Sequence, residues 1–492
     1  MKFKWFLEIV AVFILYGLRV FLLNENLFAD YDAAKNFLVI REMAQGDFVN
    51  LYHHVSPAFF LFYLPIYQLI SSASLLVHIS AMLNLLAIWW LVHFLAKELG
   101  IAYWEKIILL LFVGSSCFLV QNARAFSIES MSLPAFVGIG VYLFKYLQTD
   151  QMKHLLIWSG ILSFLLVVNY KAFLLLPYLL LVIVLVGKFK LKHTAVAFSI
   201  GIAPWLFFPL LNLWLEVDPL QLYKSFYVCA VDKNVNPTVH LSKFEWDIFF
   251  YPKYFLTFEN YLAFPTAVLF FLVSRKNLKI NLIDAEKNKL SSVFLWVFLL
   301  FFGMMSVLQK APRGLLFLYP FVYVLSFLFV QKVIKRKSLF YLVMFFLIAL
   351  NLFQLNRYVY PFAQSNYQKV AGEINRQGKV KVASTVGNGI FPWLSSEVEA
   401  DVVFYPESMA ELNEKGYDYL VVDDYFRNAG ITSFESYNST DAVFEVASPS
   451  LKSPFLYLEH CEFSGRSYRE ALAARSADIS NGHFKIRVIK VE

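Results

Sequence analysis

Long apolar runs alternate with short polar stretches along most of the chain. A helix needs about 20 mainly apolar residues to cross the hydrocarbon core of a bilayer, and about eleven runs approach that length. We predict membrane-spanning helices over residues 5–24, 74–96, 103–121, 129–147, 154–170, 172–187, 194–214, 255–274, 291–309, 314–333 and 338–355. This pattern is typical of a polytopic α-helical membrane protein.

Two parts of the chain depart from this pattern. The segment Pro57–Ile70 is apolar but too short to cross, so we expect an interfacial or re-entrant helix. From about Tyr358 onward polar residues and glycine become more frequent, and no later run is long enough to span. We therefore divide the chain into a membrane domain, residues 1–355, and a soluble domain, residues 356–492.

The soluble domain shows both helical and strand patterns. Helical spacing covers residues 367–377 and 407–416, and a glycine closes the second of these segments. β-rich runs cover residues 380–385, 417–422 and 484–491. These elements predict an α/β domain, in which we recognise no phosphate-binding glycine loop and no catalytic constellation.

Composition agrees with the membrane assignment. Hydrophobic residues make up 59% of the 492 residues and charged residues 16%, which excludes an ordinary soluble protein. The net charge of +7 does not indicate nucleic-acid binding, because Lys and Arg form short clusters between apolar runs. The first run has too long an apolar core for a signal peptide, so we expect it to be a retained span. Cys117, Cys229 and Cys461 have no metal-ligand spacing.

The basic clusters also predict an orientation. With eleven spans they all fall on one side, which the positive-inside bias makes cytoplasmic. We therefore expect a multi-pass protein of the cell (inner) membrane with a cytoplasmic N-terminus. Residues 24–57, the loop 215–254 and everything after Leu355 would then face the periplasm or the cell exterior.

The polar segment from Asn24 to Pro57, within the outer loop 24–73, holds the densest candidate chemistry. Asp30 and Asp32 follow the first apolar run directly. A carboxylate there can act as a general base on an acceptor hydroxyl, and burial near lipid would raise its pKa toward the useful range. The alternative is that these aspartates cap a helix or lie in a solvated loop.

Other ionisable residues lie near the outer ends of spans. Arg124 and Glu129 carry charges that are costly to place at membrane depth. Either these two residues are functional, or they form a structural ion pair with each other. His53 and His54 have too few neighbours for a metal site, so hydrogen bonding to phosphate or sugar is the better interpretation.

Three further cations have two interpretations each. Lys171 lies in a tight turn between two spans, and Arg313 precedes the tenth span. Either can clamp a phosphate, and either can instead extend its charged end to the membrane surface. Arg19 lies inside the first span, where extension to the surface is the default and contact with a lipid phosphate is the alternative.

The order of these features resembles the GT-C fold glycosyltransferases that use polyprenyl-phosphate sugars, specifically the protein mannosyltransferase and lipid A aminoarabinose transferase group. Asp32 corresponds to the acidic residue that starts the first outer loop of that group. Glu42–Met43, Gly46–Phe48 and Val55–Pro57 follow in the family's order and lead into an apolar interfacial segment.

The resemblance continues beyond this loop. Arg124, Glu129 and Met131 match an Arg and an acidic residue five apart followed by Met. Residues 169–177, NYKAFLLLP, and 311–320, APRGLLFLYP, resemble a Lys-containing hairpin and a later Pro-Arg span. The match covers about the first 180 residues and is thinner afterwards.

Two positions depart from the family pattern. The family's second acidic residue is replaced by Ala33, while Asp30 lies upstream. The family's Lys before two prolines is absent, and His54 or Val55 stands there. These departures bear on how a donor phosphate is held and on which sugar is carried.

The resemblance implies an inverting glycosyltransferase of GT-C type. It would move a sugar from a polyprenyl-phosphate donor to a glycan, lipid or protein acceptor at the outer membrane face. Asp32 would deprotonate the acceptor, and the candidate cations would stabilise the departing phosphate. No cofactor is implied. A pyrophosphate donor would instead favour a divalent metal bridged by Asp30, Asp32 and Glu129.

Two other classes of function stay open at this point. A secondary transporter of a polar or lipid-linked solute would also carry charge at membrane depth, although the chain shows no inverted repeat and no paired glycine-broken spans. A catalytically silent sensor would make the outer α/β domain the working part.

Overall fold

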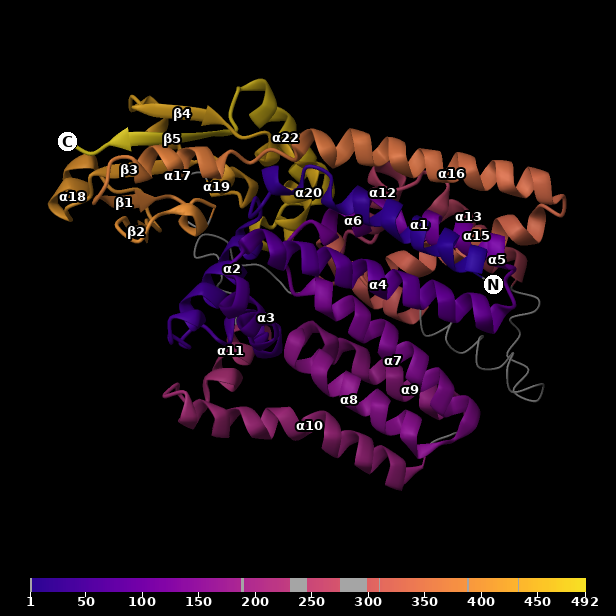
Figure 1. Ribbon diagram of the computed structural model, residues 1–492. Helices are drawn as coiled ribbons and strands as arrows, with labels where there is room; N and C mark the ends of the chain where they lie inside the picture. The colour runs from indigo at the N-terminus through magenta and orange to yellow at the C-terminus, as the bar shows by residue number, and fades with distance from the viewer. Residues whose placement is uncertain are drawn as a thin grey trace.

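The computed structural model describes residues 2–186, 190–230, 246–274, 299–308, 310–386, 389–431 and 433–492. Helices form an elongated bundle, and a β-sheet with its own helices lies at one end of that bundle (Figure 1). The polar segment that follows the first helix lies at the same end, between the bundle and the sheet (Figure 1).

Within the described residues, five helices are long and apolar enough to cross a membrane. They cover Trp5–Glu25, which overlaps α1 (Lys2–Val20), then α4 (Ala73–Leu99), α7 (Glu129–Thr149), α10 (Leu191–Trp214) and Lys337–Asn375, which contains α16 (Lys337–Tyr358). A sixth span results if α5 (Tyr103–Gly114) and α6 (Cys117–Ala123), bent by 65°, count as one. The protein is therefore built as a membrane-embedded helical bundle.

The other predicted spans coincide with shorter helices. These are α8 (Met152–Val168), α9 (Leu176–Val186), α12 (Phe250–Phe258), α13 (Ala263–Ser274) and α15 (Tyr319–Val333). Residues 291–298 and 309 of the predicted span 291–309 lie outside the described residues. A total of eleven spans thus stays a prediction. The short helix expected at Pro57–Ile70 is present as α3 (Pro57–Ile70).

A buried carboxylate holds the break between α5 and α6. Glu259 is fully buried, and its carboxylate accepts hydrogen bonds from Ser116 Oγ at 3.0 Å and from the backbone N–H groups of Cys117 at 3.2 Å and Phe118 at 2.6 Å. These N–H groups belong to the start of α6, where no earlier turn supplies an acceptor. The contact fixes the direction of α6, whose far end reaches the candidate site.

The sheet of the terminal domain has five strands in the order β2-β1-β3-β5-β4. β1 (Lys381–Ser384) pairs in parallel with β2 (Glu399–Val402) and β3 (Tyr419–Asp423), whereas β5 (Lys485–Lys490) runs antiparallel to β3 and β4 (Phe444–Ala447). The three strands predicted from sequence are confirmed as β1, β3 and β5. β2 and β4 were not predicted, because these edge strands have four residues each and bury little.

Both helices predicted for this domain are also present. They are α17 (Tyr367–Asn375) and α18 (Met409–Glu414). Ser408 and Glu411 form a reciprocal capping box at the start of α18. Gly416 follows its end with φ +74°, a backbone conformation that favours glycine.

The remaining described helices are short. They are η1 (Leu23–Glu25), α2 (Tyr31–Ala44), η2 (His53–Val55), η3 (Tyr170–Leu175), α11 (Gln221–Ala230), η4 (Pro312–Leu315), η5 (Tyr360–Phe362), η6 (Phe391–Trp393), α19 (Tyr425–Asn428), η7 (Ser433–Ser439), η8 (Pro449–Lys452), α20 (Pro454–Glu459), α21 (Cys461–Ser464) and α22 (Tyr468–Ser480). Backbone contacts link the bundle and the terminal domain. The N–H of Ser365 donates to the carbonyl of Glu25 at 3.0 Å, and the N–H of Tyr31 donates to the hydroxyl of Tyr425 at 3.0 Å.

Candidate functional site

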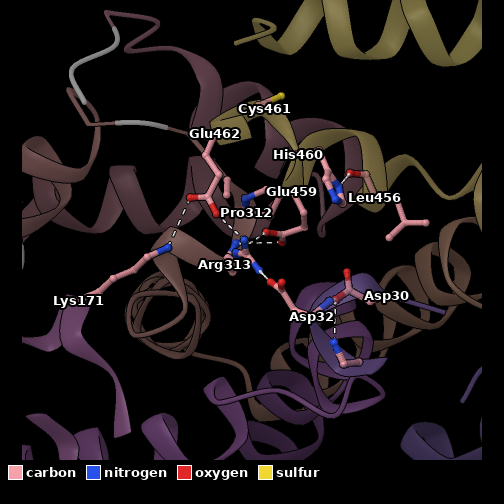
Figure 2. Close-up of polar contacts among 12 residues, drawn as sticks. Asp30, Asp32, Lys171, Pro312, Arg313, Leu456, Glu459, His460, Cys461 and Glu462 are labelled. Atoms are coloured by element: carbon pink, nitrogen blue, oxygen red, sulfur yellow. Dashed lines mark hydrogen bonds and ion pairs between the residues drawn. The ribbon is translucent and has the colours of Figure 1, made fainter. Parts of the chain in front are cut away.

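Arg313 lies at the centre of a cluster of charged side chains drawn from three distant parts of the chain (Figure 2). Its Nη1 donates to Asp32 Oδ2 at 2.7 Å, its Nη2 donates to Glu462 Oε1, and its Nε lies 3.4 Å from Glu459 Oε2. Asp32 belongs to the first polar loop, whereas both glutamates belong to the terminal domain. The fold thus assembles one ionic cluster at the junction of the two parts.

Local packing sets the position of Arg313. It lies in η4, and the following Gly314 packs so closely that a Cβ there would lie 2.8 Å from the Tyr251 hydroxyl. Tyr251 also donates a hydrogen bond to the carbonyl of Ala311 at 3.3 Å. The backbone N–H of Arg313 is held as well, because it donates to Glu459 Oε1 at 3.1 Å.

Asp30 and Asp32 have different roles in the local structure. Asp30 is the N-cap of α2, and its Oδ1 accepts from the backbone N–H groups of Asp32 at 2.9 Å and Ala33 at 3.2 Å. The capping alternative is therefore correct for Asp30. Asp32 occupies the first turn of α2, and its side chain extends toward Arg313 and His54.

The two histidines of η2 also have different surroundings. His54 Nε2 lies 3.2 Å from Asp32 Oδ1, so this ring belongs to the cluster. His54 and Val55 have φ of 51° and 54°, in the left-handed region that is costly for a β-branched residue such as Val55. The His53 ring lies against the His54 ring at a tilt of 49°, and its buried Nε2 has no hydrogen-bond partner among the described residues. Burial and the neighbouring His54 ring lower the pKa of His53 to about 2, so it stays neutral.

The pKa of Asp32 contradicts the expectation from sequence. Burial alone would raise it, but the His54 ring and the Arg313 guanidinium more than offset burial and hold the pKa of Asp32 well below its usual range. The pKa of Asp30 is raised, chiefly by burial and by the charge of Asp32. The expected rise therefore occurs at the capping residue and not at the residue that contacts the cations.

The two glutamates of the terminal domain also differ in ionisation. Burial raises the pKa of Glu459 to about 8, and the charges of Glu462, Glu129 and Asp30 add to this effect against the opposing charge of Arg313. Burial acts in the same direction on Glu462, but Lys171 and Arg313 outweigh it and lower the pKa of Glu462 to about 2. The surroundings thus favour the protonated form of Glu459 and the ionised form of Glu462.

Lys171 joins the cluster through Glu462. Its Nζ lies 3.4 Å from Glu462 Oε2, while Glu462 Oε1 binds Arg313, so one carboxylate bridges both cations (Figure 2). The turn that presents Lys171 begins with Asn169, whose Oδ1 accepts from the backbone N–H of Lys171 at 3.0 Å. The side chain of Lys171 is 42% exposed, which leaves it accessible to a ligand.

Arg124 and Arg19 mainly hold backbone in place. Arg124 donates to the carbonyls of Arg19 at 3.1 Å, Phe21 at 2.5 Å and Leu22 at 3.4 Å, and it forms no ion pair with Glu129. The Arg124–Glu129 ion pair that the sequence suggested is therefore not formed between these two described residues. Arg19 is fully buried and donates to the carbonyls of Leu15 and Gly114, so its extension to the membrane surface is wrong.

A cavity of about 90 Å³ lies against this cluster. Its lining includes four carboxylates and two arginines: Asp30, Asp32, Glu129, Glu459, Arg124 and Arg313. Asn26 Oδ1, Asn122 Nδ2 and Ser127 Oγ belong to other lining residues and have no hydrogen-bond partner among the described residues. Buried polar atoms without partners are uncommon in proteins, so this lining fits a ligand that carries hydroxyl groups.

A second link joins α2 to the terminal domain beside the cluster. Tyr425 accepts from the N–H of Tyr31 and contacts His460 Nε2 at 3.1 Å, while His460 Nδ1 lies 2.6 Å from the carbonyl of Leu456. Because Nδ1 donates to that carbonyl, Nε2 is the acceptor for the Tyr425 hydroxyl in the neutral ring. This chain of contacts fixes the segment that carries Glu459 and Glu462.

Sequence reasoning therefore located part of this site. Asp32, His54, Lys171 and Arg313 converge, and Glu129 lines the cavity. Glu459 and Glu462 were missed, because a glutamate in the terminal domain gives no local sequence signal of contact with Arg313 or Lys171. Among the described residues no group of three His, Cys, Asp or Glu side chains is placed to hold a metal ion. No protein-family model and no curated protein sequence matches the chain.

Proposed function

We propose that this protein is an integral-membrane glycosyltransferase that moves a sugar from a polyprenyl-phosphate donor to an acceptor hydroxyl at the outer membrane face. The observation that carries the proposal is the convergence of Asp32, His54, Arg313 and Lys171 beside a polar cavity at one end of the helical bundle. A lipid-linked donor would reach such a site from the bilayer, with its phosphate near the bundle end.

The cations of the cluster suit a phosphate. Arg313 presents a planar fork of donors that matches phosphate oxygens, and Lys171 adds a second positive charge across Glu462. In the structure, carboxylates form the ion pairs of both Arg313 and Lys171. A donor phosphate would replace one or more of these carboxylates and would carry comparable negative charge, so the cations stay neutralised.

Asp32 is the proposed general base. Its depressed pKa keeps it ionised at neutral pH, which is the form that accepts a proton. When a donor phosphate binds Arg313, Asp32 loses part of the interaction that lowers its pKa and becomes more basic. Attack of the acceptor oxygen on the anomeric carbon then proceeds with inversion, and the phosphate departs onto Arg313 and Lys171.

The proposal is tested with the purified full-length protein in liposomes. We would supply short-chain polyprenyl phosphates that carry mannose, glucose, galactose or a pentose, together with the membrane lipids of an envelope extract as acceptors. Mass spectrometry would follow release of free polyprenyl phosphate. Acceptor-dependent consumption of one donor, reduced in the Asp32→Asn variant but not in Asp47→Asn, supports the proposal.

A transporter is the alternative that one observation favours. The bent pair α5 and α6, with the buried Glu259 at the break, has the form of a discontinuous membrane helix, which is common at transporter binding sites. The same liposomes distinguish the two functions. Uptake of intact donor lipid or solute with no donor cleavage would overturn the transferase proposal and support transport.

A further inference from the structure

Glu459 differs from every other carboxylate of the cluster in how its two oxygens are engaged. Its Oε1 accepts from the backbone N–H of Arg313 at 3.1 Å, which fixes the carboxyl group in place. Its Oε2 is buried, has no hydrogen bond among the described residues, and lies 3.4 Å from Arg313 Nε. In contrast, both oxygens of Asp32 contact side-chain nitrogens, Oδ1 that of His54 and Oδ2 that of Arg313. Glu459 lines the cavity, whereas Glu462 does not.

The surroundings of Glu459 favour its protonated form. Charged and titratable groups face it from several elements: Arg313 of η4, Glu462 of α21, Glu129 of α7, Asp30 at the start of α2, Tyr254 of α12 and Tyr319 of α15. Arg313 is the only cation of this set, and it is shared with Asp32 and Glu462. The raised pKa of Glu459, about 8, agrees with this crowding of acidic groups.

Two carboxyl groups on one cavity thus have opposite ionisation at neutral pH. The surroundings lower the pKa of Asp32, which favours its ionised form, and raise that of Glu459, which favours its protonated form. Pairs of titratable groups whose pKa values are driven apart by their surroundings are how active sites divide acid and base roles. Their placement on the same cavity, beside the same arginine, is the geometry that such a division requires.

We propose that Glu459 is a second catalytic residue, the general acid that protonates the departing phosphate while Asp32 takes the proton of the acceptor hydroxyl. This inference rests on the proposed glycosyl transfer. The bond from the anomeric carbon to the phosphate oxygen breaks, and its electron pair stays on that oxygen, which receives the Glu459 proton. A bond from the acceptor oxygen to the anomeric carbon forms. Solvent returns the proton from Asp32 to Glu459 after product release.

The proposal gives the terminal domain a direct part in the reaction. Glu459 ends α20, and the backbone contact to Arg313 ties α20 to the membrane domain. Sugar transfer would therefore require the terminal domain to be packed against the membrane domain, since the acid and the base come from different parts of the chain.

The test is the pH dependence of kcat/KM for donor cleavage by the full-length protein in liposomes, from pH 5.5 to 9.5. Glu459 must be protonated to act, so the rate of the natural sequence should fall as pH rises through about 8. Glu459→Gln should lower kcat on the order of 10²-fold and remove this fall in rate at high pH, the alkaline limb of the profile. Glu414→Gln, on the exposed end of α18, is the matched control and should keep the limb.

A second measurement does not depend on activity. A carboxyl with a raised folded-state pKa binds more protons in the folded protein than in the unfolded chain, so it destabilises the fold increasingly as pH rises from about 4.5 to about 8. Replacing Glu459 by Gln should therefore raise Tm at pH 9 and leave it nearly unchanged at pH 5.

The outcomes separate the two proposals. If the natural sequence transfers sugar but its rate shows no alkaline limb, or if Glu459→Gln keeps that limb, Glu459 is not the acid and the glycosyltransferase assignment stands. If the natural sequence cleaves no donor at any pH, both proposals fall. An equal Tm of the two proteins at pH 9 would also count against protonation of Glu459 in the fold.

Discussion

Asp32 depends on Arg313 for its low pKa, and Arg313 depends on the ionised Asp32 and Glu462 for its own neutralisation. A largely buried cation is costly to disturb, because removing one partner of a buried ion pair leaves charge uncompensated. Substitutions at Arg313 would therefore mix effects on folding with effects on chemistry. Residues at the edge of the cluster give clearer tests.

Asp32→Asn should leave expression and donor binding nearly intact while lowering turnover by about 10²–10⁴-fold, the usual cost of losing a general base. Asparagine keeps the size of the side chain but cannot accept the proton, and Arg313 retains its ion pair with Glu462. Asp30→Asn is the matched comparison, because asparagine caps a helix as well as aspartate does. A larger loss from Asp30→Asn than from Asp32→Asn would make Asp30 the base, and native turnover of both would remove this loop from the site.

Lys171→Gln should weaken the transition state by about 2–4 kcal/mol, the range found when one preorganised charge-stabilising donor is removed. Lys171→Arg should restore part of the rate, because the charge is kept but its geometry changes. Single-turnover rates of donor cleavage measure both. Arg124→Gln serves as the contrast, since Arg124 holds the backbone of residues 19–22 and its loss should lower Tm. An unchanged rate for Lys171→Gln would exclude a role in phosphate binding.

At the scale of elements, α20 and α21 attach the terminal domain to the membrane bundle through charged side chains. Glu462 at the start of α21 contacts both Arg313 and Lys171, which lie on separate elements of the bundle. Because this attachment is ionic, its strength depends on pH.

Glu462 should contribute stability that is lost at acidic pH. Its folded-state pKa is about 2 and its ordinary value is 4.5, so the contribution is complete above about pH 4.5 and disappears as pH falls toward 2. Glu462→Gln should therefore lower Tm at pH 7, and the difference from the natural sequence should shrink at pH 3. Thermal unfolding in detergent measures this. A difference that grows on acidification would contradict the assignment.

At the scale of the whole molecule, the site requires the first polar loop and the terminal domain to lie on the same side of the membrane. Asp32, Glu459 and Glu462 contact the same arginine, so the start of α2 and the segment α20–α21 meet at one end of the bundle. The positive-inside bias predicts that this end is the outer one.

Labelling of an engineered cysteine tests this orientation. Cys461 is buried and would not react, so Ser436→Cys in η7 (Ser433–Ser439), at an exposed position, is the better probe. A membrane-impermeant thiol reagent should label it on intact spheroplasts in a background where Cys229 is replaced by Ser. Labelling only after permeabilisation would reverse the predicted topology.

The sequence alone predicted the local features of this protein. Apolar runs predicted the bundle helices, and alternating patterns predicted β1, β3 and β5. Both signals are local, because the spacing of apolar residues along the chain follows the period of the helix or strand. The edge strands β2 and β4 were not predicted, because they are short and half-exposed. The candidate cations Lys171 and Arg313, and Asp32 itself, were found from their places at the ends of apolar runs.

Only the tertiary structure decided how these residues act together. Asp32 and Arg313 are 281 residues apart, and Arg313 and the Glu459 that accepts from its backbone are 146 apart, so no local pattern could pair them. The pKa of Asp32 falls and that of Glu459 rises because of neighbours that chain folding brings close. Ionisation depends on burial and on charges within a few ångströms, and both are properties of the folded chain.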